Sequence, residues 1–246
     1  MDNTKKFTDK ADNYNQSRPS YPDAMIKFIE KYFDKNTIIA DIGSGTGILT
    51  KQLLKTASCI YAVEPNDNMR FISENNLNSY NNFYSIKATA ENTTLLNNSV
   101  DIITVAQAFH WFDVLNFKKE CHRILKPNGK IFLIWNTRDE SANINKELFS
   151  ICKQYCSDFT GFSGGIENND TKIKIFFDND YKTKTFPNQL YYNRENFINR
   201  ALSSSYSINQ DNQNYAAYIN ALNNLFDKYQ NNGIIEVANT TKVYYK

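Results

Sequence analysis

The feature that most constrains this chain is an apolar run followed by an acid and three alternating glycines, I-I-A-D-I-G-S-G-T-G at residues 38–47. Such a run, followed by a tight turn and helix-forming residues, predicts a strand, a loop and a helix start. Gly43, Gly45 and Gly47 let the backbone pass close to a ligand, because a Cβ there would hold the ligand away and restrict φ. The segment therefore predicts a nucleotide-like ligand.

The glycine spacing excludes the common phosphate-binding loops. A dinucleotide fingerprint reads G-x-G-x-x-G and a P-loop needs a lysine directly after its last glycine, but both positions fall on Ile48. Asp41 at the strand end would repel a polyphosphate and favour a cation or zwitterion. A second apolar run ends in Glu64, and an acid there in a Rossmann-like sheet accepts both ribose hydroxyls. An NAD-dependent oxidoreductase is thus disfavoured.

With these motifs the chain resembles the class I S-adenosylmethionine (SAM) dependent methyltransferases, in the type 11 small-molecule branch that includes trans-aconitate methyltransferase-like proteins. The resemblance covers nearly the whole chain. It is carried by F-T-D-K-A-D-N-Y-N-Q-S-R-P-S-Y-P from residue 7, D-I-G-S-G-T-G from 41, V-E-P from 63, A-T-A-E from 88, S-V-D-I-I-T-V-A-Q-A-F-H-W-F from 99, L-K-P-N-G from 125 and T-T-K-V-Y-Y from 240. It implies SAM as methyl donor, S-adenosylhomocysteine (SAH) as product and no metal.

Length and composition favour a single domain over residues 1–246. The 246 residues, 41% of them hydrophobic, suffice for one α/β core. A net charge of +2 with no sustained basic run indicates neither nucleic acid nor an anionic membrane as partner. No apolar segment approaches the roughly 18 residues of a membrane span, and the N-terminus lacks a secretory signal. We therefore expect a cytoplasmic protein acting on a small molecule, while its oligomeric state stays open.

Strands and helices alternate between residues 37 and 138, which predicts parallel strands with right-handed crossovers in a doubly wound α/β sheet. The strands expected there are Ile38–Asp41, Ser58–Glu64, Phe83–Lys87, Val100–Ala106 and Lys130–Trp135. The helices expected up to residue 138 are Pro22–Phe33, one after Gly47, one from Asn68, and Asn116–Leu125. Later elements are a strand at Tyr181–Phe186, helices at Arg194–Leu202 and Tyr215–Tyr229, and a closing strand or hairpin at Ile234–Tyr245.

The resemblance completes this Rossmann-like fold. It implies a seven-stranded sheet whose last strand is antiparallel. Residues 1–36 are expected to form an N-terminal helical lid, residues 37–138 the SAM-binding core, and residues 139–246 the substrate cover with the last strands. A polar stretch around residues 161–165 predicts a loop.

Ligands of open α/β sheets bind beyond the carboxyl ends of the strands, so residues there are the candidates. Asp41 acts either on the ligand or by holding loop amides. By resemblance, Met69 packs on adenine or in the core, and Glu91 meets adenine or remains a solvated acid. The predicted cofactor-binding residues are Tyr14, Arg18, Asp41, Gly43, Ser44, Gly45, Gly47, Glu64, Pro65, Met69, Ala90, Glu91 and Gln107.

Residues 107–112, Q-A-F-H-W-F, follow the fourth strand and face the transferred methyl. They lack the Asn/Asp-Pro-Pro-Tyr of amino-methyltransferases, no cysteine follows a proline as in cytosine C5 enzymes, and no Asp/Asp/Asn metal set is found. His110 is the titratable group there with a pKa suited to general-base work. Alternatively, His110 and Trp111 form only the pocket wall.

The N-terminal segment resembles the family's lid. Arg18 suits a carboxylate of the cofactor or of an acidic substrate, and Tyr14 and Tyr21 accompany it. The predicted acceptor-binding residues are Tyr21, His110 and Trp111. Two functions remain: a methyltransferase working mainly by proximity, and a catalytically inert SAM-binding partner or regulatory protein.

Overall fold

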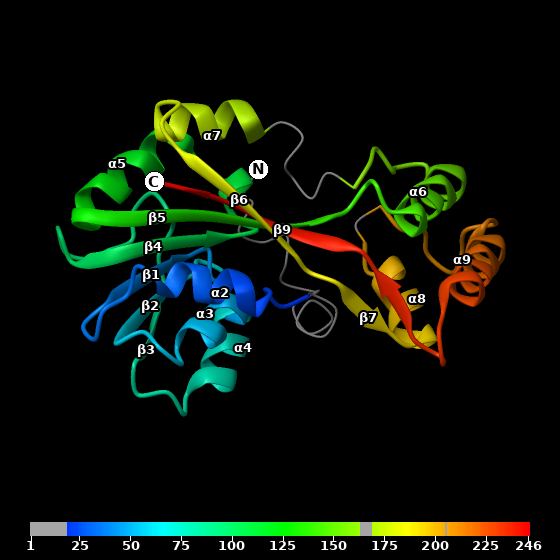
Figure 1. The fold of residues 1–246 in the computed structure, drawn as a ribbon, viewed down its shortest axis with the longest axis horizontal. Coiled ribbons are helices and arrows are strands. Elements are labelled where there is room, and N and C mark those ends of the chain that lie inside the picture. The colour runs from blue at the N-terminus through cyan, green and yellow to red at the C-terminus, as the bar shows by residue number, and fades with distance from the viewer. Residues whose placement is uncertain (1–18, 163–168, 205) are drawn as a thin grey trace.

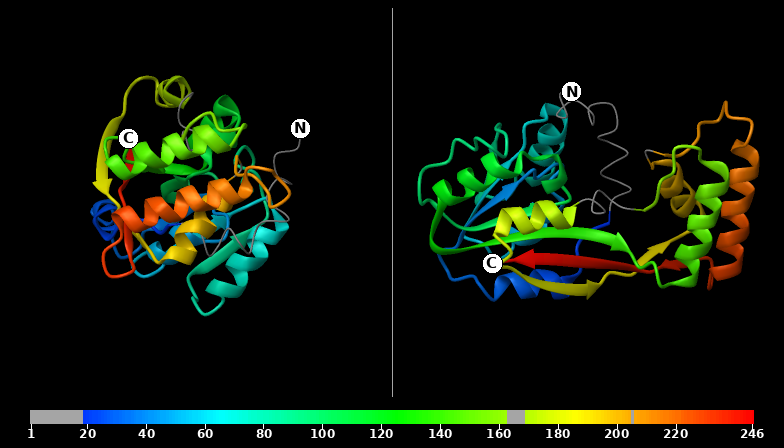
Figure 2. Two further views of the ribbon diagram at one scale, coloured as in Figure 1. Left: turned by 90° about the vertical axis from the view of Figure 1, so that its right-hand side faces the viewer. Right: turned by 90° about the horizontal axis from the view of Figure 1, so that it is seen from above.

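The computed structural model describes residues 19–162, 169–204 and 206–246. It has two parts, a sheet covered by helices on both faces and a smaller helical unit to one side (Figure 1). Strand β5 (Leu125–Arg138) runs from the sheet toward the helical unit, and β9 (Asn239–Tyr245) runs back antiparallel to its second half (Figure 2). In the described part of the chain no helix is long and apolar enough to cross a membrane.

Seven strands form the main sheet in the order β3-β2-β1-β4-β5-β9-β6. The first five are parallel, and β9 is antiparallel to both of its neighbours. The predicted seven-stranded sheet with an antiparallel last strand is therefore confirmed. The strands are β1 (Ile38–Ile42), β2 (Cys59–Val63), β3 (Phe83–Ile86), β4 (Val100–Ala106), β5 (Leu125–Arg138), β6 (Lys182–Pro187) and β9 (Asn239–Tyr245).

Side chains of successive strand residues point to opposite faces, and each face builds its own core. Along β5, Phe132 and Ile134 pack on one face, while Leu133 and Trp135 pack on the other. The first face is covered by α2 (Asp23–Glu30), α3 (Ile48–Leu53) and α4 (Asp67–Leu77). The second is covered by α5 (Val114–Ile124) and α7 (Asn169–Phe177).

The helical unit comprises α6 (Asn143–Tyr155), α8 (Arg194–Leu202), α9 (Tyr215–Tyr229) and the two-stranded sheet of β7 (Leu190–Tyr192) and β8 (Ile235–Val237). It has a third core, separate from the two that flank the main sheet. Tyr218 and Leu222 of α9 are fully buried in it, and Leu148 and Cys152 of α6 face them. The cover expected over residues 139–246 thus contains a packed unit of its own.

Two expectations need correction. α6 and α7 occupy a stretch where the sequence pattern is irregular, and β7 was not expected. β5 begins at Leu125, five residues before the expected start, because a register irregularity between Val100 and Ile102 lets its first residue pair with β4. α2 buries Met25 and Ile29 in the sheet core. The lid expected over residues 1–36 stays a prediction, and residues 1–18 of it lie outside the described residues.

Candidate functional site

The glycine loop joins β1 to α3 and folds onto the end of β2. Gly43, Gly45 and Gly47 have φ of +68°, +57° and +82°, the left-handed region that glycine adopts without strain. The amides of Gly43 and Ser44 donate to the carbonyl of Val63 at 2.8 and 3.1 Å. The loop therefore lies against the strand that precedes Glu64, as the sequence pattern predicted.

The three glycines pack against different neighbours. A Cβ on Gly43 would lie 2.6 Å from the Cβ of Ala108, and one on Gly47 would lie 2.8 Å from Leu77 Cδ1, so both are required by close packing. A Cβ on Gly45 would meet only the sulfur of Met69, at an ordinary 3.7 Å. Gly45 is therefore the glycine whose free side is available to a ligand.

Glu64 follows β2 and reaches across to the glycine loop. Its Oε2 accepts from the amide of Gly45 at 3.0 Å, and its Oε1 accepts from the amide of Asn66 at 2.9 Å. The residue is 8% exposed, and burial raises the pKa of its carboxyl even though these two amides and Arg70 oppose the shift. An ionised carboxylate has about four acceptor positions, so two remain for a diol.

Asp41 lies beneath the loop instead of facing out of it. Its two oxygens accept from the hydroxyls of Thr50 at 2.6 Å and Thr104 at 2.8 Å, and burial raises the pKa of its carboxyl to about 6. Asp41 thus ties β1 to α3 and β4. In the described part of the chain the hydroxyls of Ser44 and Thr46 are enclosed and have no hydrogen-bond partner, which is unusual for buried polar groups.

The loops after β2 and β3 bring further predicted residues to this edge. Asn66 caps α4 by accepting from the amide of Met69 at 3.0 Å, which holds Met69, 4% exposed, beside Gly45. Pro65 precedes this cap. Ala90 is buried, and one oxygen of Glu91 accepts from the amide of Asp113, the cap of α5.

The loop after β4 carries a backbone outlier. Gln107 has φ of +57°, which is uncommon for a residue with a side chain and concentrates at functional sites. Its amide donates to the carbonyl of Ile134, and its Nε2 donates to the carbonyl of Asn136 at 3.0 Å. Asn136 in turn accepts from Asn188 and donates to the carbonyl of Ser20. Asn136 was missed by the sequence analysis, although it directly follows an apolar run at a strand end.

His110 and Trp111 lie in the single turn η2 (Phe109–Trp111), with ring centroids 4.7 Å apart. The carbonyl of His110 accepts from Lys172 of α7 at 3.3 Å, and Trp111 is 39% exposed. Tyr21 is only 7% exposed, because it packs in the α2 and α3 core. This burial leaves the Tyr21 ring little surface for an acceptor. Tyr14 and Arg18 lie outside the described residues.

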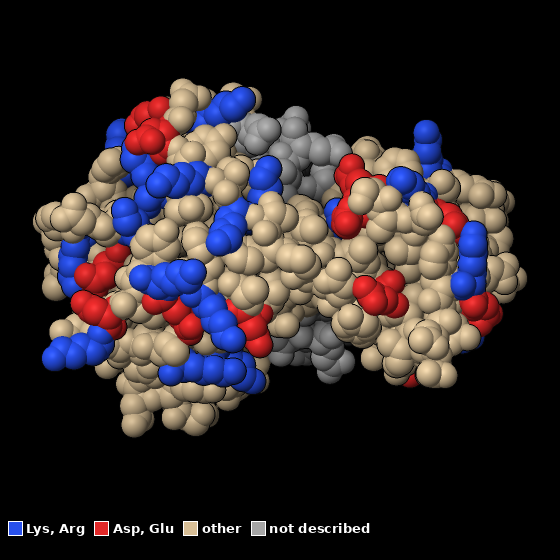
Figure 3. Space-filling model, viewed as in Figure 1, with Lys and Arg blue, Asp and Glu red and all other residues tan. Residues whose placement is uncertain are grey.

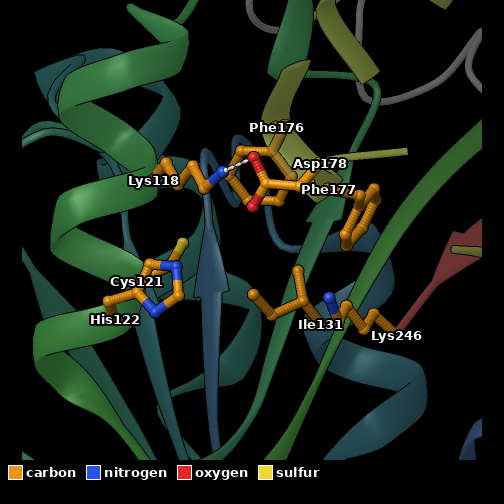
Figure 4. Close-up of a pocket in the computed structure, with 8 residues that line it drawn as sticks. All are labelled: Lys118, Cys121, His122, Ile131, Phe176, Phe177, Asp178 and Lys246. Carbon is orange, nitrogen blue, oxygen red and sulfur yellow. Dashed lines mark ion pairs between the residues drawn. The ribbon is translucent and has the colours of Figure 1, made fainter. Parts of the chain in front are cut away.

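A hollow elsewhere on the molecule is too small to be the cofactor site. It lies between α5, α7 and the amino end of β5, and Lys118, His122 and Lys246 stand at its rim (Figure 4). Its volume is about 70 Å³, far below the roughly 300–1,000 Å³ of small-molecule sites. The second histidine of the chain therefore lies far from the carboxyl edge of the sheet.

Comparison with known proteins agrees with this geometry. Residues 40–133, which include the glycine loop, Glu64 and the β4 loop, match a family model described as a methyltransferase domain. An uncharacterized methyltransferase of Mycobacterium tuberculosis is 36% identical over 138 residues, which cover 56% of this chain and 55% of that protein. An uncharacterized methyltransferase-like protein of Schizosaccharomyces pombe is 34% identical over 158 residues, covering 63% and 60%.

The fold is shared more widely than the sequence. The structure of a proposed type II methyltransferase from Anaeromyxobacter dehalogenans superimposes with a TM-score of 0.67 over 93% of this chain and 96% of that one, at 16% identity. Such low identity shows the fold alone. The chain spans little more than half the length of the curated relatives it matches.

Proposed function

We propose that this protein is a class I methyltransferase that transfers a methyl group from SAM to a small-molecule acceptor, because residues 40–133 match a family model described as a methyltransferase domain. The observation that carries the proposal is the pairing of Glu64 with Gly45. A half-satisfied buried carboxylate stands beside the open side of a glycine, with buried Asp41 beneath the same loop. This arrangement suits a nucleoside that carries a ribose diol and no phosphate.

The residues present fit SAM in three respects. The remaining acceptor positions of Glu64 suit the two ribose hydroxyls. The open side of Gly45, next to Met69, suits the close approach of a flat nucleoside edge. The enclosed hydroxyls of Ser44 and Thr46 have no hydrogen-bond partner among the described residues. They lie in the loop that would meet the zwitterionic end of SAM. Gln107, Ala90 and Glu91 complete the proposed cofactor-binding set, with Asp41 as a positioning residue.

When bound, SAM supplies a methyl group activated by a sulfonium. The work left to the chain is to align the acceptor with that methyl and to exclude water. Alignment alone is worth up to ~7–11 kcal/mol of the barrier. The rigid contacts of Gln107 with β5, and of Gly43 with Ala108, fix the backbone on which the acceptor would be positioned.

A general base is needed only if the acceptor arrives protonated. His110 is the proposed base in that case, and with Trp111 it forms the proposed acceptor wall. A base contributes about 10²–10⁴-fold to a rate, so His110→Ala should reduce turnover by that amount for a hydroxyl acceptor. A variant that keeps its turnover would leave alignment as the whole mechanism.

The proposal is tested by calorimetry followed by labelled transfer. The full chain is titrated with SAM, SAH and NAD⁺, and we expect saturable binding of SAM and SAH only. Binding of NAD⁺ in their place would overturn the assignment. The chain is then incubated with [methyl-³H]SAM and a fractionated small-metabolite extract. Label in the metabolite fraction supports a methyltransferase, whereas tight SAM binding without transfer to any fraction identifies an inert SAM-binding protein.

A further inference from the structure

Arg138 is the last residue of β5, at the carboxyl edge of the sheet where it meets the helical unit. It lies opposite Asn239 in the pairing of β5 with β9. Two residues earlier, Asn136 receives the hydrogen bond from Gln107. Arg138 therefore stands beyond the strand ends that the proposed site uses, on the side of the cover.

The guanidinium of Arg138 is held by neutral groups. Its Cζ lies 3.8 Å from the ring centroid of Phe162, and its Nη1 donates to the hydroxyl of Tyr206 at 3.4 Å. Its Nε is enclosed and, in the described part of the chain, has no hydrogen-bond partner. The guanidinium of Arg138 is therefore oriented by two aromatic residues, and its Nε–H is a hydrogen-bond donor that the described residues leave unused.

Three other arginines of the described residues are paired with acids. Arg70, Arg123 and Arg194 each form an ion pair with an aspartate or glutamate. Between Arg138 and the carboxylates of residues 19–162, 169–204 and 206–246 there is no such pair.

A second cation adds to the positive charge in this part of the helical unit. The guanidinium of Arg200 lies 5.4 Å from the ring centroid of Tyr192. The charges of Arg200 and Arg138 both act to lower the pKa of the Tyr192 hydroxyl, against a larger opposite effect of burial. Tyr192 therefore lies within electrostatic reach of Arg138 as well as of Arg200.

We infer that Arg138 binds a carboxylate of the methyl acceptor, as an anchor that is separate from the atom receiving the methyl. This rests on the proposed function. A planar guanidinium fork matches a carboxylate in a bidentate pair, and the rings of Phe162 and Tyr206 suit the apolar body beside it. A carboxylate engaged in this pair has one lone pair on each oxygen occupied and its charge partly neutralised, so it is a weaker nucleophile than a free carboxylate.

Binding is tested by calorimetry on the full chain saturated with SAH. The probes are benzoate, phenylacetate, hexanoate and succinate, each compared with its amide. At least one acid should bind saturably and at least about tenfold more tightly than its amide, as expected for hydrogen bonds to a charged group. Absence of binding by all four acids, or equal binding of acid and amide, overturns the inference. Failure of SAH itself to bind would overturn the proposed function instead.

Substitutions of Arg138 test whether its guanidinium is the group that binds the carboxylate. Arg138→Met keeps the stem on Phe162 and should weaken the bound acid by about 10- to 100-fold, while Arg138→Lys keeps the charge without the fork and should weaken it by about tenfold. The matched control is Arg194→Met, which removes another arginine stacked on a ring of the same unit, Phe226. Melting temperature and SAH affinity verify the fold. Wild-type affinity for the acid in both Arg138 variants overturns the inference.

Whether the anchored carboxylate is distinct from the methylated atom is tested separately, by asking if the bound acid becomes a methyl ester. Each acid that binds is incubated with [methyl-³H]SAM, and the product is treated with alkali, which releases the label of a methyl ester as methanol. Acids with no second nucleophile should bind and remain unlabelled. An alkali-labile ester of benzoate, phenylacetate or hexanoate, which have a single carboxylate, would show that the anchored carboxylate itself accepts the methyl, and would overturn its role as an anchor.

Discussion

The sheet and the helical unit differ in what holds them and in what their surfaces offer. The sheet builds two cores from strands whose ends carry loops with fixed backbone demands, such as Gly43 and Gln107. The helical unit builds one core from amphipathic helices with no comparable motif. On the face shown in Figure 3, charged side chains crowd over the sheet, whereas most of the helical unit is uncharged.

This difference suits a division of labour. The proposed cofactor contacts, Gly45 and Glu64, lie just after β1 and β2, two strands that are paired on both sides in the sheet. The proposed acceptor anchor, Arg138, ends β5 and packs against rings of the helical unit. The proposed donor and acceptor sites thus depend on different parts of the molecule. If the two parts are separable, a change in the core of one should leave the binding properties of the other intact.

The largest expected loss of stability comes from truncating one buried side chain in the core of each part. Leu53 of α3 and Leu222 of α9 are both fully buried, one in each part. Truncation of either to alanine should lower the free energy of unfolding by about 2–5 kcal/mol. Leu53→Ala should also weaken SAH binding, because α3 begins at the glycine loop, while Leu222→Ala should leave it unchanged. Thermal melts, hydrogen exchange and calorimetry measure this; a parallel loss of SAH affinity in Leu222→Ala would break the comparison.

A pH-dependent effect should be confined to the sheet. Burial raises the pKa of Asp41 to about 6 from the usual 3.8, so the folded chain binds a proton more tightly than the unfolded one. Stability from this group is present below about pH 4 and is lost as pH rises through about 6. Relative to Asp41→Asn, the wild type should lose about 3 kcal/mol across that interval. Denaturant unfolding at pH 4, 5, 6 and 7 measures the difference, and parallel pH profiles would contradict it.

Some elements of both parts are predicted well from the sequence because their signals are local. β4 and the helices α8 and α9 have the expected bounds, since their apolar residues recur with one clear period. α7 was missed because Ile173, Ile175, Phe176 and Phe177 lie almost in a row, which resembles a strand as much as a helix. α6 was missed because Phe149, Ile151 and Tyr155 blur its buried stripe of Ile144, Leu148 and Cys152.

Prediction of the site is limited in the same way, because only residues with a local sequence signal can be recognised. Glu64 and Gly45 are recognisable because each stands at a fixed offset from a buried strand, and the structure joins them at 3.0 Å. Asn136 and Arg138 are positioned by the pairing of β5 with β9, a strand that comes about a hundred residues later in the sequence. Their partners Asn188 and Tyr206 come from other distant segments. No local spacing encodes such contacts.

A smaller effect concerns the ribose assignment. Glu64→Ala should weaken SAM binding by ~1.5–3 kcal/mol, the usual range for hydrogen bonds to a charged group. The control is Glu74→Ala, which removes an exposed glutamate of α4 that pairs with Arg70. Calorimetry with SAM measures both. Unchanged affinity in the Glu64 variant would refute the assignment, and equal losses in both variants would trace the effect to α4 instead of to the ribose contact.

The smallest expected change in stability gives the sharpest test of where the ligand lies. Gly45→Ala and Gly233→Ala both place a methyl group at a left-handed φ, +57° and +78°, and neither new Cβ meets a close neighbour. Each should cost about 1 kcal/mol of folding free energy through the backbone alone. Only Gly45→Ala should lose affinity for SAH, because only its methyl would occupy the space we assign to the nucleoside. If calorimetry finds SAH affinity equal in the two variants and the wild type, the open side of Gly45 faces no ligand, and the nucleoside must approach the sheet by another route.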